Sequence, residues 1–217
     1  MPYRDMLGVG IIFVLILTVD VVCGPITTFV LASPRKSRLE MLLDLTLVAI
    51  IQMAALTYGL HVVWSARPAV LAFEHDRLTV LSASEVEQAD LVHAPQGFRA
   101  LPFSGVLKVA TRKSKDNVEF LRSIDLSLAG LSPAMRPGWW EPMEAHHEQM
   151  RAKAKPLTAL IEKQSGHTVE LTTAANATGY PVSALTYLPL TSSKTKDWIA
   201  LLNSSMDVVG YAPVDGF

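Results

Sequence analysis

Two long apolar stretches near the N-terminus, Leu7 to Leu31 and Met41 to Trp64, constrain this sequence more than any other feature. A helix of about 20 apolar residues crosses the hydrocarbon core of a bilayer, which is about 30 Å thick. Only a short basic segment, residues 33–38, separates the two stretches. We therefore expect a transmembrane helical hairpin over residues 1–65, with helices at about 7–31 and 41–64.

The basic segment predicts the orientation of this hairpin. Arg35, Lys36 and Arg38 lie between the two spans, and short cytoplasmic loops are enriched in such residues. The loop is therefore expected in the cytoplasm, with both ends of the hairpin on the other side. In a bacterium this makes a multi-pass inner-membrane protein, and residues 66–217 form a periplasmic domain.

Composition excludes some classes of function. The 217 residues carry a formal net charge of −1, which gives no electrostatic reason to expect a nucleic-acid partner. The only cysteine is Cys23, inside the first span, so neither an intramolecular disulfide nor a cysteine zinc site can form. The bilayer itself is the one partner that composition indicates.

One acidic residue, Asp20, lies near the middle of the first span. Placing such a residue in the bilayer centre costs about 2.5–3.5 kcal/mol, so it normally faces protein. Gly24 and Pro25 follow one turn later, and Pro25 should kink the helix. A turn near Lys36 would place Asp20 level with Gln52. Asp20 and Gln52 could form a clasp that fixes the helix register, Asp20 could contact another membrane helix, or it could belong to a proton or ion pathway.

The segment after the hairpin predicts an α+β fold rather than a doubly wound sheet. Strands at 69–73 and 78–81 should form a hairpin, and a further strand is expected at 106–111. An amphipathic helix is expected at 116–128, a long helix at 144–164 and a short helix at 169–177. Three closing strands are expected at 185–190, 198–203 and 208–213.

A search for chemistry in this domain finds no assembled site. Neither a zinc-protease helix, nor a phosphate-binding loop, nor a nucleophile elbow occurs in the sequence. His146 and His147 are adjacent and point about 100° apart on a helix, which favours a solvated helix face over a metal site. We therefore expect no enzyme activity, cofactor or metal. Trp139 and Trp140 could form a binding platform or pack in the core, and Phe217 could tuck against the domain or join a docking surface.

Motifs along nearly the whole chain resemble one family. They include Val19-Asp20-Val21-Val22-Cys23-Gly24-Pro25, Gln52-Met53-Ala54-Ala55-Leu56-Thr57-Tyr58-Gly59-Leu60, Leu121-Arg122-Ser123-Ile124-Asp125, Arg136-Pro137-Gly138-Trp139-Trp140 and the ending Ala212-Pro213-Val214-Asp215-Gly216-Phe217. In these segments the sequence resembles the type IV pilin accessory proteins, a family of fimbrial assembly proteins. Members usually begin with one more transmembrane helix, so a further helix is expected upstream of Met1.

The resemblance implies a non-catalytic inner-membrane chaperone that helps the major type IV pilin reach the assembly machinery. Other inner-membrane pilus assembly proteins are further implied partners. The hypothesis for the membrane contact with the pilin helix is the set Asp20, Gly24, Pro25 and Gln52. For the exported domain it is the set Trp139, Trp140 and Phe217. The alternative functions are a membrane-tethered periplasmic ligand-binding sensor and a periplasmic enzyme acting on pilin. The sensor is disfavoured because it needs a cytoplasmic output domain, and only the loop at residues 33–38 is expected in the cytoplasm.

Overall fold

The computed structural model describes residues 2–31 and 37–217, except the side chains of residues 19, 20, 23 and 27–31. Contacts divide the chain into two units, which are described separately. One is Gly8–Arg67, and the other joins Met1–Leu7 to Pro68–Phe217. The sequence predicted a division at residues 65 and 66. The N-terminal segment Met1–Leu7, which that division places with the hairpin, groups with the C-terminal unit.

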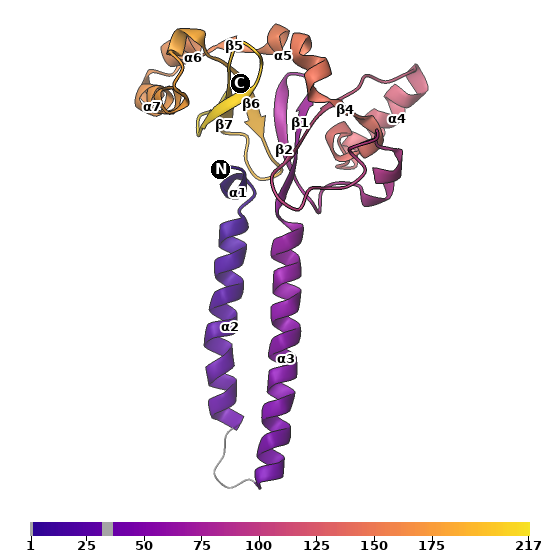
Figure 1. The fold of residues 1–217 in the computed structure, drawn as a ribbon, viewed down its shortest axis with the longest axis vertical. Helices are drawn as coiled ribbons and strands as arrows, with labels where there is room; N and C mark the ends of the chain where they lie inside the picture. The colour runs from indigo at the N-terminus through magenta and orange to yellow at the C-terminus, as the bar shows by residue number, and fades with distance from the viewer. Residues whose placement is uncertain (1, 32–36) are drawn as a thin grey trace. The chain divides into compact units, whose positions relative to one another are not determined.

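The unit Gly8–Arg67 consists of two long helices that run side by side (Figure 1). Helix α2 is Val9–Leu31 and continues through Pro25, while α3 is Arg38–Ser65. A capping box begins α3: the Ser37 hydroxyl accepts from the Glu40 backbone N–H, and the Glu40 carboxylate accepts from the Ser37 N–H. Among the described residues, α3 is the one helix long and apolar enough to cross a membrane, and only 6% of its apolar window is buried.

The C-terminal unit is built on an eight-stranded mixed sheet, which confirms the predicted α+β class. The strand order is β4-β3-β1-β2-β6-β7-β8, and β5 pairs with β6 outside this path. The strands are β1 Pro68–Glu74, β2 Arg77–Ser82, β3 Leu107–Thr111, β4 Trp140–Pro142, β5 Lys155–Pro156, β6 Thr186–Thr191, β7 Trp198–Leu202 and β8 Val208–Ala212.

Neighbouring strands in the sequence pair as expected, whereas distant strands supply the parallel pairs. β1 and β2 form the predicted antiparallel hairpin, and β6, β7 and β8 form the predicted meander. In addition, β1 pairs parallel with β3, and β2 pairs parallel with β6. The pairing of β2 with β6 joins the two halves of the sheet.

Four α-helices longer than one turn surround the described part of this sheet: α4 Asn117–Leu128, α5 His147–Lys153, α6 Leu157–Lys163 and α7 Thr168–Thr178. The single long helix predicted at 144–164 is wrong. Proline has no backbone N–H to donate and disfavours helical backbone in the residue before it. At Lys155–Pro156 the chain therefore extends and pairs with Thr186 and Tyr187 of β6, and this separates α5 from α6.

Apolar side chains on the sheet form separate core clusters in its two halves. One cluster gathers Val70, Leu81, Val109 and Trp140 around β1, β2 and β3. Another packs α6 and α7 against the closing strands through Leu157, Leu160, Leu171, Tyr187, Ile199 and Leu201. Each half of the sheet therefore has its own hydrophobic support.

The N-terminal segment is anchored in this unit. Helix α1, Tyr3–Met6, buries Tyr3 and Met6. The Tyr3 and Tyr211 hydroxyls are hydrogen-bonded, and their rings meet edge to face with centroids 5.2 Å apart. The Ser192 hydroxyl donates to the Met6 carbonyl at 3.0 Å. The chain thus leaves this unit at Gly8 and returns to it at Pro68.

Candidate functional site

The contact between α2 and α3 is the first candidate site, because it carries the residues that the sequence singled out. Gly59 of α3 is buried against Ile16 of α2. A Cβ atom at position 59 would lie only 2.7 Å from Cγ2 of Ile16, closer than side chains tolerate. Small residues at such crossings allow helix backbones to approach closely. Gly59 is therefore required for this helix spacing.

The structure brings Gln52 and Gly24 together. The Gln52 side-chain amide donates to the Gly24 carbonyl across a long 3.5 Å hydrogen bond. Gln52 thus lies level with Gly24, one turn further along α2 than the predicted position, Asp20. The predicted turn at Lys36 assumed that the two helices meet symmetrically about it, whereas the contacts show them offset by about one turn, 5.4 Å.

The remaining residues of the predicted membrane site are less closely defined. Pro25 lies within α2 and is exposed. The side chain of Asp20 lies outside the described residues, so its contact with Gln52 or with another helix stays a prediction.

The outer surface of the helix pair is apolar. The large side chains exposed there include Ile11, Leu15, Val22, Leu43, Ile50, Met53 and Leu60. A water-soluble monomer rarely exposes a continuous apolar surface larger than a few hundred Å². This surface is therefore suited to lipid or to apolar helices of a partner.

A second candidate site lies in the C-terminal unit around Trp139. The guanidinium carbons of Arg112 and Arg136 lie over the Trp139 ring, 4.5 and 4.4 Å from its centroid. Cation–π contacts of this kind fix the ring in position. They leave Trp139 half-buried at the wall of a cavity of about 760 Å³.

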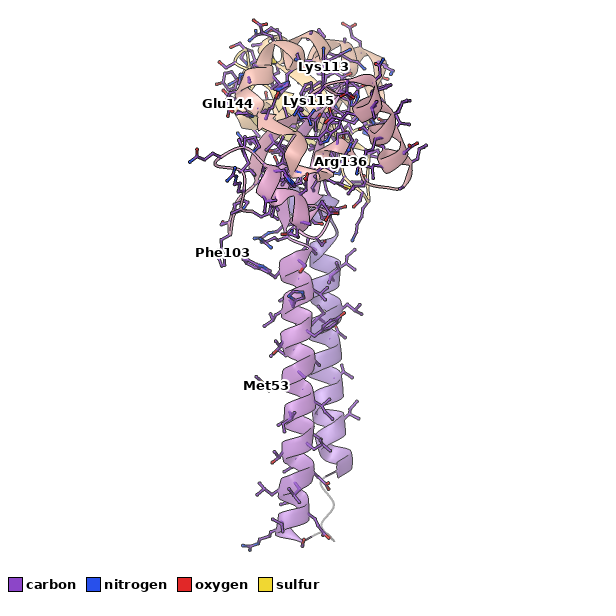
Figure 2. The ribbon with its side chains drawn as sticks, turned by 90° about the vertical axis from the view of Figure 1, so that its right-hand side faces the viewer. Met53, Phe103, Lys113, Lys115, Arg136 and Glu144 are labelled. Carbon is purple, nitrogen blue, oxygen red and sulfur yellow. The ribbon has the colours of Figure 1, made fainter. Side chains whose placement is uncertain are left out.

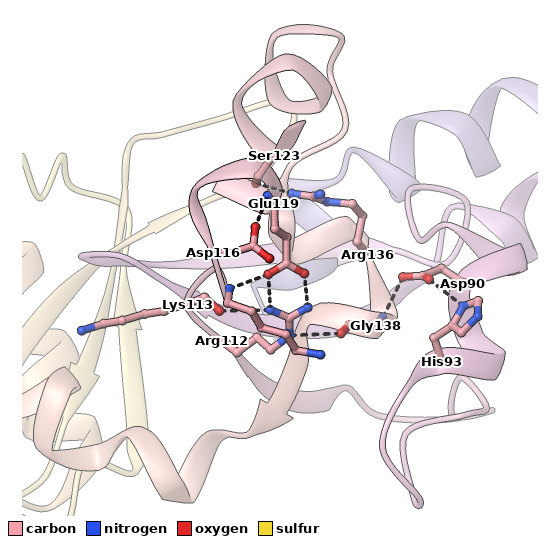
Figure 3. A network of polar contacts seen from close by, with 10 residues as sticks. Asp90, His93, Arg112, Lys113, Asp116, Glu119, Ser123, Arg136 and Gly138 are labelled. Carbon is pink, nitrogen blue, oxygen red and sulfur yellow. Dashed lines mark hydrogen bonds and ion pairs between the residues drawn. The ribbon is translucent and has the colours of Figure 1, made fainter. Parts of the chain in front are cut away.

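The same two arginines also bond to helix α4, and Figure 3 shows these contacts with Glu119 and Ser123. Arg112 donates both terminal nitrogens to the Glu119 carboxylate, at 2.9 and 2.6 Å. Hydrogen bonding from Arg112 is the largest cause that lowers the pKa of Glu119, to about 2. The buried Arg136 donates to the Ser123 hydroxyl at 2.6 Å, and burial lowers the pKa of Arg136. The side of α4 that faces the domain is therefore held by polar contacts.

Helix α4 consequently presents its apolar side to solvent. The exposed residues are Val118, Phe120, Leu121, Ile124 and Leu128, whereas Ser123 is the buried one. An amphipathic helix normally turns its apolar side to the core. The predicted helix is confirmed, since Asp116 caps it by accepting from the Glu119 N–H at 2.7 Å. Its apolar side, however, is exposed, and a polar residue, Ser123, is the buried one.

Asp90 closes the other side of the cavity. Its carboxylate accepts from the Gly138 N–H at 2.7 Å and contacts His93 Nδ1 at 3.0 Å. A Cβ atom at Gly138 would lie 3.1 Å from both Asp90 oxygens, so a side chain there would require the carboxylate to shift by a few tenths of an ångström. Sequence reasoning missed Asp90, Arg112 and Arg136, because their contacts join segments far apart in the chain.

The two other residues predicted for the exported domain lie in different places. Trp140 is 1% exposed and donates its indole N–H to the Ala134 carbonyl at 2.8 Å, so it packs in the core. Phe217 is 41% exposed, with the Arg77 guanidinium 4.9 Å from its ring centroid. Lys163 also donates to Phe217 O at 2.9 Å. A role of these residues in partner binding stays a prediction.

His146 is not on a solvated helix face, as the sequence had favoured, but is buried. Its Nε2 lies 2.7 Å from the Glu141 carboxylate, and its Nδ1 lies 3.3 Å from the Gln149 amide oxygen. Met143, the first residue of the short helical turn Met143–His146, is buried as well. Within residues 2–31 and 37–217, no group of three or more His, Cys, Asp or Glu side chains is arranged to hold a metal ion.

Acid should loosen α4 through Glu119. Because the folded-state pKa of Glu119 lies below its ordinary value of about 4.3, the stabilisation is present above that pH and is lost as the pH falls toward 2. Relative to the intrinsic rate of hydrogen exchange at each pH, which itself falls as the pH is lowered from 5, exchange of the α4 amides should therefore be faster near pH 2 than at pH 5, an excess that appears as a lower protection factor. In Glu119→Gln this excess should disappear, whereas in Glu148→Gln, a matched exposed carboxylate, it should persist.

Comparison with known proteins gives matches along the whole chain. The fimbrial assembly proteins of serogroups I and E1 from Dichelobacter nodosus are each 30% identical over 217 residues, covering 100% of this chain and 84% of each relative. The fimbrial assembly protein of serogroups C1 and C2 from the same organism is 37% identical over 93 residues, or 43% of this chain and 71% of that relative. No family model and no solved structure matches the chain.

Proposed function

Because the chain belongs to the family of fimbrial assembly proteins, we propose that it is a non-catalytic inner-membrane chaperone for type IV pilin. The single observation that carries this proposal is the 30% identity over all 217 residues to proteins named for fimbrial assembly. The likeness includes both the apolar helices and the C-terminal unit. Both are therefore proposed to take part in the same function.

The proposal includes a two-helix membrane anchor with the C-terminal unit in the periplasm. Support comes from the apolar outer surface of α2 and α3 and from the route of the chain. The segment Met1–Leu7 and the segment Pro68–Phe217 belong to one folded unit, and α2 and α3 lie between them. If α3 crosses the bilayer, α2 must cross it in the opposite direction, because both ends of the pair return to the same unit.

The helix pair is proposed to receive the apolar N-terminal helix of pilin before assembly. Such a helix needs protein contacts that can be released when the subunit leaves the membrane. Pro25 is exposed on α2, and beside it the Gly24 carbonyl accepts from the Gln52 side-chain amide. Asp20 is proposed to complete this docking face.

Replacing Asp20 with leucine should reduce surface piliation while the protein stays in the membrane. Leucine removes the carboxylate and with it the polar contact that a mid-membrane acid normally makes with protein. Surface pili are counted by electron microscopy, and membrane content is measured by immunoblot. Leu17→Ala, an apolar replacement at an exposed position of the same helix, serves as the control. Normal piliation in Asp20→Leu would exclude this role.

Cross-linking in intact cells tests the partner directly. A photoreactive residue is placed at Met53, which is exposed on α3, and cross-linked products are isolated from membranes. Pilin should be the dominant product and should disappear when pilin is deleted. A photoreactive residue at Lys153, which is exposed on α5 in the C-terminal unit, provides the comparison for contacts outside the bilayer. Absence of pilin from the products at both positions would contradict the proposed function.

A further inference from the structure

The loop before β3 carries an exposed aromatic residue. Phe103 is 80% exposed, and Figure 2 shows it at the outer tip of its loop. Phe98 and Leu101, earlier in the same loop, pack against the core cluster of β1, β2 and β3. The loop is therefore anchored at its base, while its apolar tip is presented to the surroundings.

The strand register places this loop at the end of the sheet where β1 begins. β1 and β3 are parallel, and Val70 pairs with Leu107, so both strands begin at the same end of the sheet. Phe103 precedes Leu107 by four residues. Pro68, the first residue of β1, follows the last residue of α3, Ser65, by three residues. The linker between α3 and the beginning of β1 is therefore only Ala66 and Arg67, so the chain offers little length between the proposed anchor and this end of the sheet.

We propose that Phe103 inserts into the headgroup region of the periplasmic leaflet and that its loop is a membrane contact of the C-terminal unit. The inference rests on the proposed membrane anchor. Phe is among the apolar residues that interfacial segments bury at the boundary between headgroups and acyl chains, and a bulky apolar side chain gains by leaving water. Arg99 supports the contact, because its side chain is held on the loop by donating to the Ala94 carbonyl at 3.1 Å and its charge suits anionic headgroups.

The larger apolar face of α4 fits lipid less well. Helix α4 follows the last residue of β3, whereas the Phe103 loop precedes the first residue of β3. The two are therefore connected to opposite ends of this strand. The polar residues within α4 include Glu119 and Asp125 against one basic residue, Arg122. Helices that lie on membranes usually carry Lys and Arg on the polar face. Lipid is therefore assigned to Phe103 rather than to α4.

Fluorescence quenching tests the assignment on the full chain. Phe103→Cys, Leu128→Cys and Met53→Cys are made separately in a Cys23→Ala background, labelled with an environment-sensitive fluorophore and reconstituted in phosphatidylethanolamine–phosphatidylglycerol vesicles. Leu128 is the matched control, because it is 84% exposed on α4. Met53 is 61% exposed on α3 and reports on the proposed anchor.

Spin-labelled lipid should quench emission at positions 103 and 53, and aqueous iodide should quench it at 128. Iodide quenching at 103 with lipid quenching at 53 would overturn the loop contact and leave the anchor intact. Iodide quenching at 53 would overturn the anchor as well. Lipid quenching at 128, or a response at 103 that requires added pilin, would also overturn the assignment of lipid to this loop.

Discussion

Replacing Trp140 with alanine should lower the free energy of unfolding of the C-terminal unit by about 3–5 kcal/mol, the usual cost of removing a large aromatic side chain from a core. Trp140 is fully buried in the cluster around β1, β2 and β3. The substitution also leaves the Ala134 carbonyl, which accepts the indole N–H at 2.8 Å, without this donor. Both losses act on the same half of the sheet.

Urea unfolding followed by near-ultraviolet circular dichroism measures this effect on the full chain in detergent micelles. Trp139→Ala is the matched control, because Trp139 is only half-buried and its ring contacts the side chains of Arg112 and Arg136. It should cost clearly less than Trp140→Ala. Equal losses for the two substitutions would contradict the burial difference between these neighbouring residues.

Replacing Tyr3 with alanine should detach the N-terminal segment from the C-terminal unit at a cost of about 3 kcal/mol. Tyr3 is buried and contacts Tyr211 through both its ring and its hydroxyl. Arg4 itself is exposed, but the buried residues Tyr3 and Met6 hold the segment around it in place. Trypsin should therefore cleave slowly after Arg4. In Tyr3→Ala that cleavage should accelerate before the domain unfolds, because a released segment opens locally.

Tyr3→Phe separates the ring from the hydroxyl. It should retain most of the attachment, since the buried ring remains. Burial is the largest cause that raises the pKa of Tyr3, so the attachment is fully present below about pH 10 and weakens at higher pH, where a released tyrosine ionises. Trypsin cleavage after Arg4 should therefore accelerate above that pH in the natural sequence and less so in Tyr3→Phe. Equal cleavage in Tyr3→Ala and the natural sequence would contradict the anchoring.

Local sequence patterns predicted the elements that depend on local chemistry. The hairpin of β1 and β2 and the closing meander follow from β-prone segments separated by short turns. The parallel pairs of β1 with β3 and of β2 with β6 join residues far apart in the chain, so no local signal could reveal them. The spacing of apolar residues over 144–164 predicts one helix, whereas Pro156 interrupts it and lets the chain pair with β6.

The candidate sites show the same distinction. Gly24 and Gln52 were found from polarity and residue size within apolar spans, and the structure brings them together. The arginine contacts around Trp139 were missed, because Arg112 and Arg136 act across the fold. The exposure of the apolar face of α4 also could not be inferred, since periodicity identifies an amphipathic helix and does not show which side meets the core.

Topology labelling tests the central claim, that a two-helix anchor returns both of its ends to a periplasmic unit. Single cysteines replace Arg4, Ser33 or Lys113 in a Cys23→Ala background, and intact spheroplasts are treated with a membrane-impermeant maleimide. Arg4 and Lys113 are both exposed in the C-terminal unit. The account predicts labelling at positions 4 and 113 in intact spheroplasts and at position 33 only after permeabilisation. Protection of position 4 together with labelling of position 113 would contradict it.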